Sequence, residues 1–451
     1  MHFKSINPYN GEVLGGFPKQ TEEELTRLLH HGRKAFEDWR LTSIAERIGY
    51  VEMLAQTVRS QLDTLARTIT LEMGKTLKES KAEIEKCAWL CDYYAEHAEG
   101  FLKDQKIQTD ATESYVRYDP LGGVFAIMPW NYPFWQVFRF AIPALMAGNT
   151  AVLKHAPNVF GCAKEIASLF AVAGFPDGAF LSLTVDVDQV PGIIADRYIQ
   201  GVTLTGSGQA GASVAATAGS HIKKTVLELG GSNAFVVLAD ANLDHAVDLA
   251  VRSRMQNAGQ SCIAAKRIIV VREIYEVFQE KLVRSVSNLK TGDPLDDSVD
   301  MGPLARTDLA EKLEDQVMLS VKSGAEVLCG GIRRGAFYKP TVLNKVQPGM
   351  PVFDEETFGP VAPLVMAQDE QDAYRLAAMS EYGLGITICT QDIERVRSRI
   401  HLIDQGAVFV NELVKSDPRL PFGGVGKSGY GRELGEEGIR SFVNRKTVYI
   451  A

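Results

Sequence analysis

The sequence predicts an α/β protein that is built around parallel sheets and divided into more than one domain. From Gly122 onward, short apolar runs alternate with amphipathic stretches of helical spacing, a pattern typical of strand–helix–strand units. A length of 451 residues exceeds what one hydrophobic core ordinarily organises. The hydrophobic content of 45% and the charged content of 23% are those of a globular chain with a large core.

The charge and the cysteines exclude several classes of partner. A net charge of −8, with basic residues only in short pairs, predicts no nucleic-acid partner because nothing would neutralise the phosphates. No apolar run is long enough to span a membrane and the first residues lack the apolar stretch of a signal peptide, so no membrane partner is expected. The six cysteines have neither disulfide nor zinc-site spacing, which predicts a reducing, cytoplasmic setting and no metal.

The N-terminal part of the chain is predicted to be helical. Thr21 and Glu24 form a capping-box pattern ahead of apolar residues at helical spacing, and the same periodicity continues over about 43–102. Residues 105–119 then favour extended structure and resemble a polar hairpin whose edge needs a partner. The segment 441–450 is predicted to be a late strand.

The middle of the chain predicts two sheets. Five apolar runs are interpreted as buried strands: 123–128, 150–154, 180–184, 201–205 and 225–229. Amphipathic helices are expected between them, for example over 159–173 and 208–218. The alternation resumes over 234–271 and about 325–410, which predicts a second α/β unit.

A thiol and a carboxylate in glycine-containing segments are the candidates for covalent chemistry. Cys262 ends the segment QNAGQSC, and Glu228 begins ELGG. A thiolate can attack a carbonyl carbon, and a carboxylate can activate the water that clears the resulting intermediate. The alternative is that Cys262 is a small buried hydrophobe, which is the commoner use of a lone cysteine.

Three further segments each allow a structural and a functional interpretation. Gly206 and Ser207 lie in a turn between a strand and a helix, where N–H groups can bind a pyrophosphate or merely form the turn. Asn131, in MPWNYP, can donate to an oxyanion or cap a turn. Lys154 ends a buried strand, where a lysine can face a ligand crevice or be a solvated surface residue. Two loop-like segments complete the set: FDEETFGPV at 353–361 and LPFGGVGKSG at 420–429.

Taken together, these motifs resemble the aldehyde dehydrogenase family over essentially the whole chain, with the succinate-semialdehyde dehydrogenase branch most similar. The resemblance implies a Rossmann-like cofactor domain, an α/β catalytic domain and a small β oligomerisation element. The expected bounds are 1–104 and 120–229 for the cofactor domain, 230–425 for the catalytic domain, and 105–119 with 434–451 for the oligomerisation element. A homodimer or homotetramer is expected.

The resemblance also implies a mechanism. Cys262 matches the nucleophile that forms a thiohemiacetal with the aldehyde, and Asn131 with the Cys262 backbone N–H matches the oxyanion hole. Hydride transfer to a nicotinamide leaves an acyl thioester, and Glu228 matches the base for its hydrolysis. Further matches contact the cofactor: Trp130, Lys154, Gly206, Ser207, Glu356 and Phe358.

Departures from the family pattern bear on the cofactor and on proton transfer. Pro157 stands where many NAD-preferring relatives have a glutamate near the adenosine ribose, so NAD and NADP are both expected to bind. Phe140 replaces a lysine that some relatives pair with the glutamate matching Glu433, which predicts no such relay here. Ala264 replaces a second cysteine, so no adjacent disulfide switch is expected.

The predicted substrate is a small aldehyde, with succinate semialdehyde first. Arg139 matches an arginine that binds the distal carboxylate in that branch, and Ser416 lies on the loop that supplies a hydroxyl donor. The alternative for Arg139 is an ion pair with a helix neighbour. Glutarate semialdehyde and uncharged aliphatic aldehydes stay open as substrates. Two other classes compete with a dehydrogenase. A cysteine hydrolase of esters or thioesters would need no cofactor motifs, and a catalytically silent binding protein would need no intact set of Cys262, Glu228 and Asn131.

Overall fold

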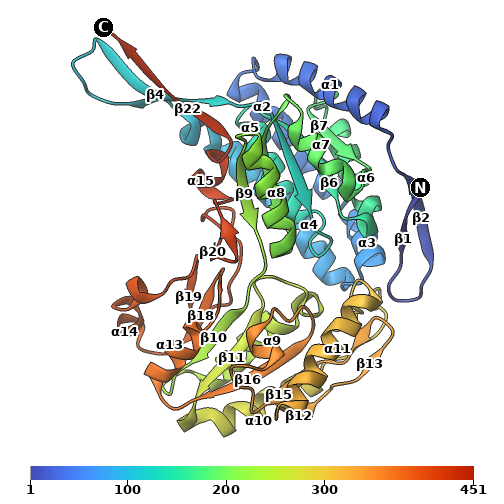
Figure 1. Cartoon of the computed structure of the whole chain (residues 1–451), viewed down its shortest axis with the longest axis vertical. Coiled ribbons are helices and arrows are strands. Elements are labelled where there is room, and N and C mark those ends of the chain that lie inside the picture. Colours follow the sequence, from blue (N-terminus) through green and yellow to red (C-terminus); the bar gives the residue numbers. More distant parts are fainter. Residues whose placement is uncertain (1) are drawn as a thin grey trace.

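Two parallel sheets organise the chain, one in each lobe of the molecule (Figure 1). The computed structural model describes residues 2–451. The first sheet has the strand order β21-β9-β8-β5-β6-β7, in which only β21 is antiparallel to its neighbour. Its bounds are β5 (Gly123–Met128), β6 (Thr150–His155), β7 (Phe180–Leu183), β8 (Ile199–Thr205), β9 (Lys224–Glu228) and β21 (Gly429–Tyr430). The five predicted strands are confirmed to within two residues at each end.

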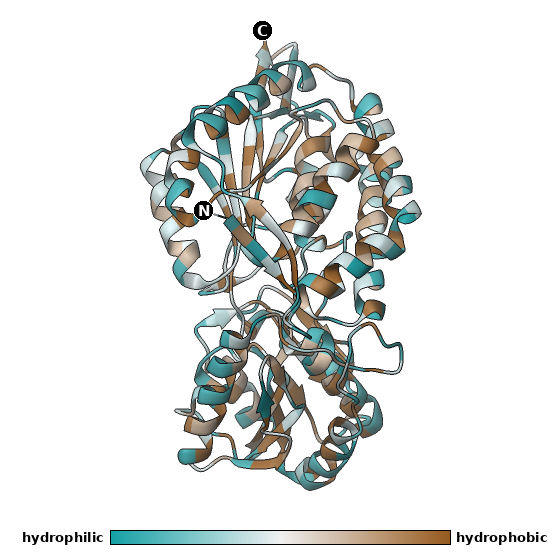
Figure 2. Ribbon diagram, turned by 90° about the vertical axis from the view of Figure 1, so that its right-hand side faces the viewer, coloured by the Kyte–Doolittle hydropathy of each residue, from teal (hydrophilic) through white to brown (hydrophobic). Residues whose placement is uncertain are grey.

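Helices cover both faces of this first sheet, which explains why its strands carry apolar side chains on both faces. In β5, Val124 and Ala126 join one core, whereas Phe125 joins the other. Figure 2 shows the hydrophobic strands enclosed by helices whose outer faces are hydrophilic. One face packs on α2 (Ile44–Ser60), α3 (Leu62–Met73), α4 (Leu77–Leu102), α5 (Trp135–Met146) and α6 (Phe160–Val172). The other packs on α1 (Glu22–Trp39), α7 (Val190–Ala195) and α8 (Gly208–Ser220).

Capping boxes fix where the N-terminal helices begin. The predicted box of Thr21 and Glu24 at the start of α1 is confirmed, and Ser43 and Thr76 cap α2 and α4 in the same way. Each box satisfies backbone N–H groups that the first helical turn would leave unpaired. The long helix α4 is thereby held in place at the end that approaches the second lobe.

The second sheet has the strand order β12-β15-β16-β11-β10-β18-β19 and confirms the predicted second α/β unit. Its edge strand β12 is antiparallel to β15, which the helical alternation did not predict. Its strands are β10 (Asn233–Val237), β11 (Ala265–Val271), β12 (Glu326–Cys329), β15 (Thr341–Asn344), β16 (Val361–Ala367), β18 (Ile386–Cys389) and β19 (Val408–Val410). Its helices are α9 (Leu243–Met255), α10 (Tyr275–Ser287), α11 (Thr307–Lys322), α12 (Pro351–Asp354) and α13 (Glu370–Ala378).

A three-stranded antiparallel sheet projects from the first lobe (Figure 1). It contains β3 (Gln105–Lys106), β4 (Glu113–Pro120) and β22 (Val443–Ile450), as the hairpin and late-strand interpretations predicted. β22 pairs with β4 along its whole length, from Val443 opposite Pro120 to Ile450 opposite Glu113. The late strand therefore covers one edge of the predicted hairpin.

The remaining elements are short. An N-terminal hairpin, which the sequence patterns did not predict, lies beside the first lobe. It consists of β1 (His2–Ile6) and β2 (Val13–Pro18). The others are β13 (Arg333–Arg334), β14 (Phe337–Tyr338), β17 (Tyr382–Gly383), β20 (Val425–Gly426), α14 (Ile393–Arg397), α15 (Gly435–Ile439), and the 3₁₀ turns η1 (Pro157–Val159), η2 (Val187–Gln189), η3 (Gln256–Gly259), η4 (Arg272–Ile274) and η5 (Ile400–Leu402).

Candidate active site

A cavity of about 160 Å³ unites residues that are far apart in the sequence, Cys262, Arg139 and Ser416 among them. Helices α4 and α5, the segment around Cys262 and the loop 413–422 form its wall. Two buried oxygens of the wall, Gln136 Oε1 and Ser261 Oγ, have no hydrogen-bond partner among residues 2–451. The lining residues are Glu79, Ala82, Glu83, Lys86, Tyr132, Trp135, Gln136, Arg139, Gln256, Ser261, Cys262, Ile263, Leu413, Lys415, Ser416 and Phe422.

The backbone just before Cys262 is strained. Asn257 and Ala258 have φ values of 55° and 51°, in the left-handed region that non-glycine residues rarely occupy. Gly259 follows with φ of 72°, and a Cβ there would lie 2.2 Å from the carbonyl oxygen of Gly359. The sequence therefore needs glycine at position 259, and the surrounding structure must hold the other two residues in place.

Arg254 is the residue that holds this segment, and sequence reasoning missed it. Its buried guanidinium donates to the carbonyl oxygens of Thr357 at 3.0 Å and Gly259 at 3.5 Å, and also to those of Val361 and Gly359. These bonds join the segment around the cysteine to the segment 357–361 of the second lobe. These hydrogen bonds pair the buried carbonyl oxygens with the N–H groups of the guanidinium, which has lost its solvent. Burial lowers the pKa of Arg254 to about 9.

Asn131 is bonded directly to the segment that carries the cysteine. Its Nδ2 donates to the backbone carbonyl oxygen of Gln260 at 3.0 Å. Its backbone carbonyl oxygen accepts from Asn257 Nδ2 at 2.8 Å. Gln136 Nε2 donates to Asn131 Oδ1 at 3.1 Å, which fixes the amide orientation. Because an amide nitrogen carries two hydrogens, one N–H of Asn131 stays available to a ligand.

The surroundings of Cys262 disfavour its thiolate. The side chain is half-buried, and burial raises the pKa of the thiol to about 11. Arg139 and Lys266 act in the opposite direction, whereas the carboxylates of Glu356 and Glu228 add to the increase in this pKa. The protein as described therefore holds a protonated thiol at neutral pH.

Glu228 is buried at the end of β9 and forms no ion pair with a cation among residues 2–451. Burial, followed by the charge of Glu433, raises its pKa well above the usual range, and Arg139 only partly opposes this. Its Oε1 has no hydrogen-bond partner among the described residues. A Cβ on Gly423 would lie 2.7 Å from that oxygen, so the glycine-rich segment 420–429 packs closely against it. A carboxylate with a raised pKa suits a general base.

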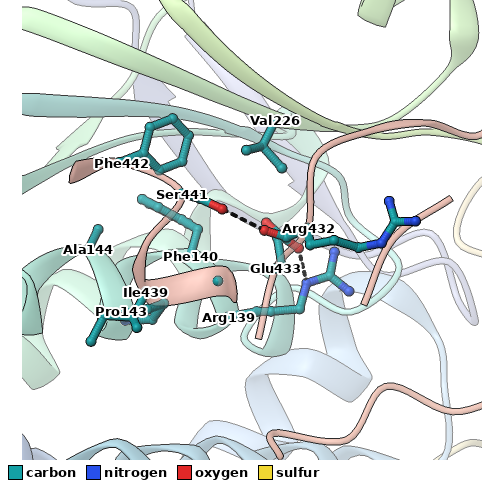
Figure 3. A pocket seen from close by; sticks show the side chains of 11 residues that line it. Arg139, Phe140, Pro143, Ala144, Val226, Arg432, Glu433, Ile439, Ser441 and Phe442 are labelled. Atoms are coloured by element: carbon teal, nitrogen blue, oxygen red, sulfur yellow. Dashed lines mark hydrogen bonds and ion pairs between the residues drawn. The ribbon is translucent and has the colours of Figure 1, made fainter. Parts of the chain in front are cut away.

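Arg139 reaches the cavity but has an ionic partner. It projects from α5 and forms a buried ion pair with Glu433, and Figure 3 shows the two side chains pointing toward one another. Its Nη2 also donates to Thr205 Oγ1 at 3.3 Å, and its guanidinium lies 4.9 Å from the centre of the Phe422 ring. The ion-pair alternative is thus realised, with a residue distant in sequence rather than a helix neighbour. Carboxylate binding by Arg139 stays a prediction.

Ser416 accepts two hydrogen bonds at the cavity wall. Trp135 Nε1 and Lys86 Nζ each donate to its Oγ at 3.0 Å. The Lys86 ammonium also lies 4.1 Å from the centre of the Trp135 ring. Lys86 was not among the predicted site residues, although Glu79, Glu83 and Lys86 recur at helical spacing on one face of α4.

The predicted pyrophosphate and ribose residues lie at the carboxyl edge of the first sheet. Ser207 caps α8, whose first N–H groups follow β8 directly. Lys154 is the penultimate residue of β6, is 5% exposed and has no carboxylate within ion-pair distance among residues 2–451. A buried lysine without a counter-charge fits a ligand that brings phosphate or hydroxyl oxygens. Pro157 begins η1 just beyond, and its side chain is exposed.

The other residues expected to contact the cofactor, Glu356, Phe358 and Trp130, come together between the lobes. Glu356 Oε1 accepts from Lys266 Nζ at 2.8 Å and from the Gly231 N–H at 3.1 Å. Phe358 and Trp130 are in edge contact, with ring centroids 5.7 Å apart. Lys266 was missed, although a lysine inside the apolar run 265–271 is a recognisable signal. These side chains and the open end of α8 fit a dinucleotide.

Within residues 2–451, no helix combines the length and apolar character that crossing a bilayer requires. Over the same range, histidine, cysteine and acidic side chains nowhere gather in threes or more as a metal site would need.

Known proteins resemble this chain over its whole length. The profile described as the Aldehyde dehydrogenase family matches residues 1–448. A protein of Synechocystis named probable succinate-semialdehyde dehydrogenase [NADP(+)] is 46% identical, with 100% of both chains covered. One of Escherichia coli named succinate semialdehyde dehydrogenase [NAD(P)+] is 45% identical, covering 99% of this chain and 98% of the other. The crystal structure of succinic semialdehyde dehydrogenase from Streptococcus pyogenes in complex with NADP+ superposes with a TM-score of 0.97, at 37% identity and 99% coverage of each chain.

Proposed function

This chain belongs to the aldehyde dehydrogenase family, and on that premise we propose that it oxidises succinate semialdehyde to succinate with NADP or NAD. The observation that carries the proposal is the single cavity in which Cys262 shares a wall with Ser416. A nucleophile and a polar anchor in one small cavity suit a short substrate with a carbonyl at one end and a carboxylate at the other. The similar proteins of Synechocystis and Escherichia coli carry names for the same reaction.

In the proposed reaction, the Cys262 thiolate attacks the aldehyde carbon and forms a carbon–sulfur bond. The remaining N–H of Asn131 and the Cys262 backbone N–H stabilise the alkoxide that develops on the aldehyde oxygen. The nicotinamide cofactor, when bound, accepts the hydride that the thiohemiacetal loses. Glu228 then removes a proton from water, whose oxygen attacks the thioester carbon and releases the acid and the Cys262 thiolate.

Lys154, Gly206, Ser207 and Glu356 would hold the cofactor, with Trp130 and Phe358 beside it. The exposed position of Pro157 supports the use of both cofactors, because no carboxylate there repels a 2′-phosphate. Pro157→Glu should therefore weaken NADP far more than NAD. Fluorescence titration with each cofactor measures this difference, and equal losses for the two would show that position 157 lies away from the ribose phosphate.

The test of the activity is a substrate panel. Purified protein receives NADP or NAD with succinate semialdehyde, glutarate semialdehyde or butanal, and the formation of reduced cofactor is followed. We expect the largest kcat/KM for succinate semialdehyde and no reduction with Cys262→Ala. A hydrolase would instead cleave a thioester without any cofactor. A butanal preference in the wild type would contradict the proposed substrate but not the dehydrogenase chemistry.

The domain roles and the setting belong to the same proposal. Residues 1–104 and 120–229 bind the cofactor, 230–425 carry the nucleophile, and 105–119 with 434–451 join subunits in a homodimer or homotetramer. The exposed residues of the projecting β22 support the last role. The six cysteines are all free thiols, which supports a reducing, cytoplasmic setting.

A further inference from the structure

Lys86 differs from the other cations of the active-site cavity because it has no carboxylate partner. Arg139 pairs with Glu433, and Lys415 pairs with Glu412 at 3.1 Å. No carboxylate among residues 2–451 lies within ion-pair distance of Lys86 Nζ, whose protein contacts are the Ser416 hydroxyl and the face of Trp135. A cation on a cavity wall without its own counter-charge is suited to an anionic ligand.

The hydrogen bonds of Ser416 leave its own proton free. A serine hydroxyl has two acceptor lone pairs and one donor hydrogen. Lys86 and Trp135 occupy the two lone pairs of Ser416, both at 3.0 Å, so the O–H must point elsewhere. No acceptor for it lies among residues 2–451. The Ser416 O–H and the spare N–H groups of Lys86 are therefore adjacent donors, matched to the two oxygens of one carboxylate.

The carboxylates of the same wall are already engaged. Glu83 pairs with Lys75 through one oxygen, and its other oxygen accepts the N–H groups of Phe134 and Trp135 at 2.8 and 2.9 Å. Glu79 caps α4 through one oxygen and accepts the Asn257 N–H at 2.6 Å through the other. On the neighbouring loop, Asp417 pairs with Arg419 at 2.8 Å. None of these groups is bound to Lys86, so its charge is directed to the cavity.

Helix α4 gives the cavity a polarity that matches the substrate. Glu79 contacts the segment before Cys262, and Lys86 contacts Ser416 two helical turns further along. At 1.5 Å of rise per residue, the two side chains start about 10 Å apart along the helix axis. A substrate with an aldehyde at one end and a carboxylate at the other is repelled by Glu79 in the reversed orientation. The negative charge of Glu79 and the positive charge of Lys86 thus favour the orientation in which the aldehyde group of the substrate lies at Cys262.

Arg139 is less suited to supply this charge. Its ion pair with Glu433 is buried, and Figure 3 shows the guanidinium turned toward that carboxylate. Recruiting Arg139 to a substrate would leave Glu433 unpaired in a desolvated position, which is costly. Replacing Arg139 is accordingly expected to impair all aldehydes, whereas a residue that binds only the substrate carboxylate affects one class of aldehyde.

We propose that Lys86, together with the Ser416 hydroxyl, binds the distal carboxylate of the substrate and that Lys86 is the main determinant of selectivity for semialdehydes over uncharged aldehydes. This inference rests on the proposed function. The ligand class that it specifies is a short carboxylate-bearing aldehyde, or the dicarboxylate formed from it.

The experiment compares kcat/KM for succinate semialdehyde and for butanal in the wild type, Lys86→Met and Lys86→Arg. Losing one charged hydrogen-bond partner should lower the semialdehyde-to-butanal ratio about 10- to 100-fold in Lys86→Met, because butanal has no carboxylate that could bind Lys86. Lys86→Arg should recover much of the ratio because it keeps the charge. Lys81→Met is the matched control, because Lys81 lies on the same helix but pairs at the surface with Asp63 at 2.7 Å. Butanal turnover reports that each variant is folded.

Two further measurements separate a binding role from a structural one. Succinate should inhibit butanal oxidation competitively in the wild type and much less in Lys86→Met.

Burial, then the charge of Arg139, lowers the pKa of Lys86 to about 8, and Cys87, Asp417 and Glu83 oppose this. The cation is therefore present below that pH and is lost as the pH rises through it. The selectivity ratio of the wild type should fall above about pH 8, and Lys86→Arg should remove this break.

The outcomes separate this inference from the proposed function. If the wild type prefers the semialdehyde and Lys86→Met keeps both that preference and succinate inhibition, Lys86 does not bind the carboxylate. Equal losses on both aldehydes in Lys86→Met, with no recovery in Lys86→Arg, assign Lys86 a structural role and also overturn the inference. If the wild type itself shows no preference for the semialdehyde, the proposed substrate fails, and the inference fails with it.

Discussion

At the residue scale, the nucleophile and the base both lie in surroundings that keep them protonated. Burial raises the pKa of the Cys262 thiol to about 11 and that of the Glu228 carboxyl well above its usual range. Each group must therefore lose its proton before it can act as nucleophile or base. A rise in pH produces both reactive forms.

This protonation gives a prediction for thiol reactivity. Because the pKa of Cys262 lies far above neutrality, its thiolate fraction should rise about tenfold per pH unit between pH 7 and 9. Alkylation by iodoacetamide, followed by peptide mass spectrometry, measures the rate at Cys262 in the cofactor-free protein. Cys329, which is partly exposed on β12, serves as the internal comparison in the same digest. A rate at Cys262 that levels off near pH 7 would show that the thiolate already dominates there.

The base gives a second prediction. Glu228 can accept a proton only when ionised, so thioester hydrolysis should slow as the pH falls through its raised pKa. Glu433→Gln removes the charge that helps to raise this pKa and should move the acid limb of the hydrolysis rate to lower pH. Glu228→Gln should instead give a burst of reduced cofactor and an acyl-enzyme detectable by mass spectrometry. An unchanged acid limb in Glu433→Gln would mean that the two carboxyls do not interact during turnover.

At the element scale, the segment around η3 depends on contacts that no local pattern encodes. Gly259→Ala places a Cβ 2.2 Å from the Gly359 carbonyl oxygen at a φ of 72°, so it should destabilise the fold by about 1–3 kcal/mol and remove most activity. Gly219→Ala is the matched control, because a Cβ there meets nothing within 4 Å and φ is ordinary. Denaturant unfolding and steady-state rates test the pair. Similar stabilities for the two variants would show that the segment relaxes freely.

Sequence patterns predicted elements wherever the signal was local. The strands of the first sheet carry apolar side chains on both faces because helices cover both faces, and the Thr21–Glu24 box marks the start of α1. Other features depend on residues distant in sequence. Asn257, with its left-handed φ, is held by hydrogen bonds to Glu79 and to the Asn131 carbonyl oxygen, and β12 is set by pairing with β15. Cys262 was a candidate from its own segment, Ser416 came from the family resemblance, and Lys86 required the side-chain contacts.

At the scale of the whole molecule, the arm formed by β3, β4 and β22 leaves the outer edge of β22 without a partner strand among residues 2–451. β22 pairs with β4 on one side only, and Tyr449 and Ile450 on it are 53% and 47% exposed. We expect self-association through this arm, with Ile450→Lys shifting the particle toward the monomer mass of 49.4 kDa. Light scattering after size exclusion measures this shift. A monomeric wild type would remove the arm's proposed role.

The pairing of Arg139 with Glu433, and of β9 with β21, has a consequence for protein synthesis. The first lobe emerges from the ribosome early, yet its sheet edge and the counter-charge of its buried arginine come from residues translated near the end. Domains generally fold in the order in which they are synthesised, but the first lobe cannot complete its sheet until a late segment of the chain has been made. A nascent chain arrested before residue 429 should therefore be sensitive to proteases in the first lobe. The enzyme would gain its reactive centre only when translation is almost finished.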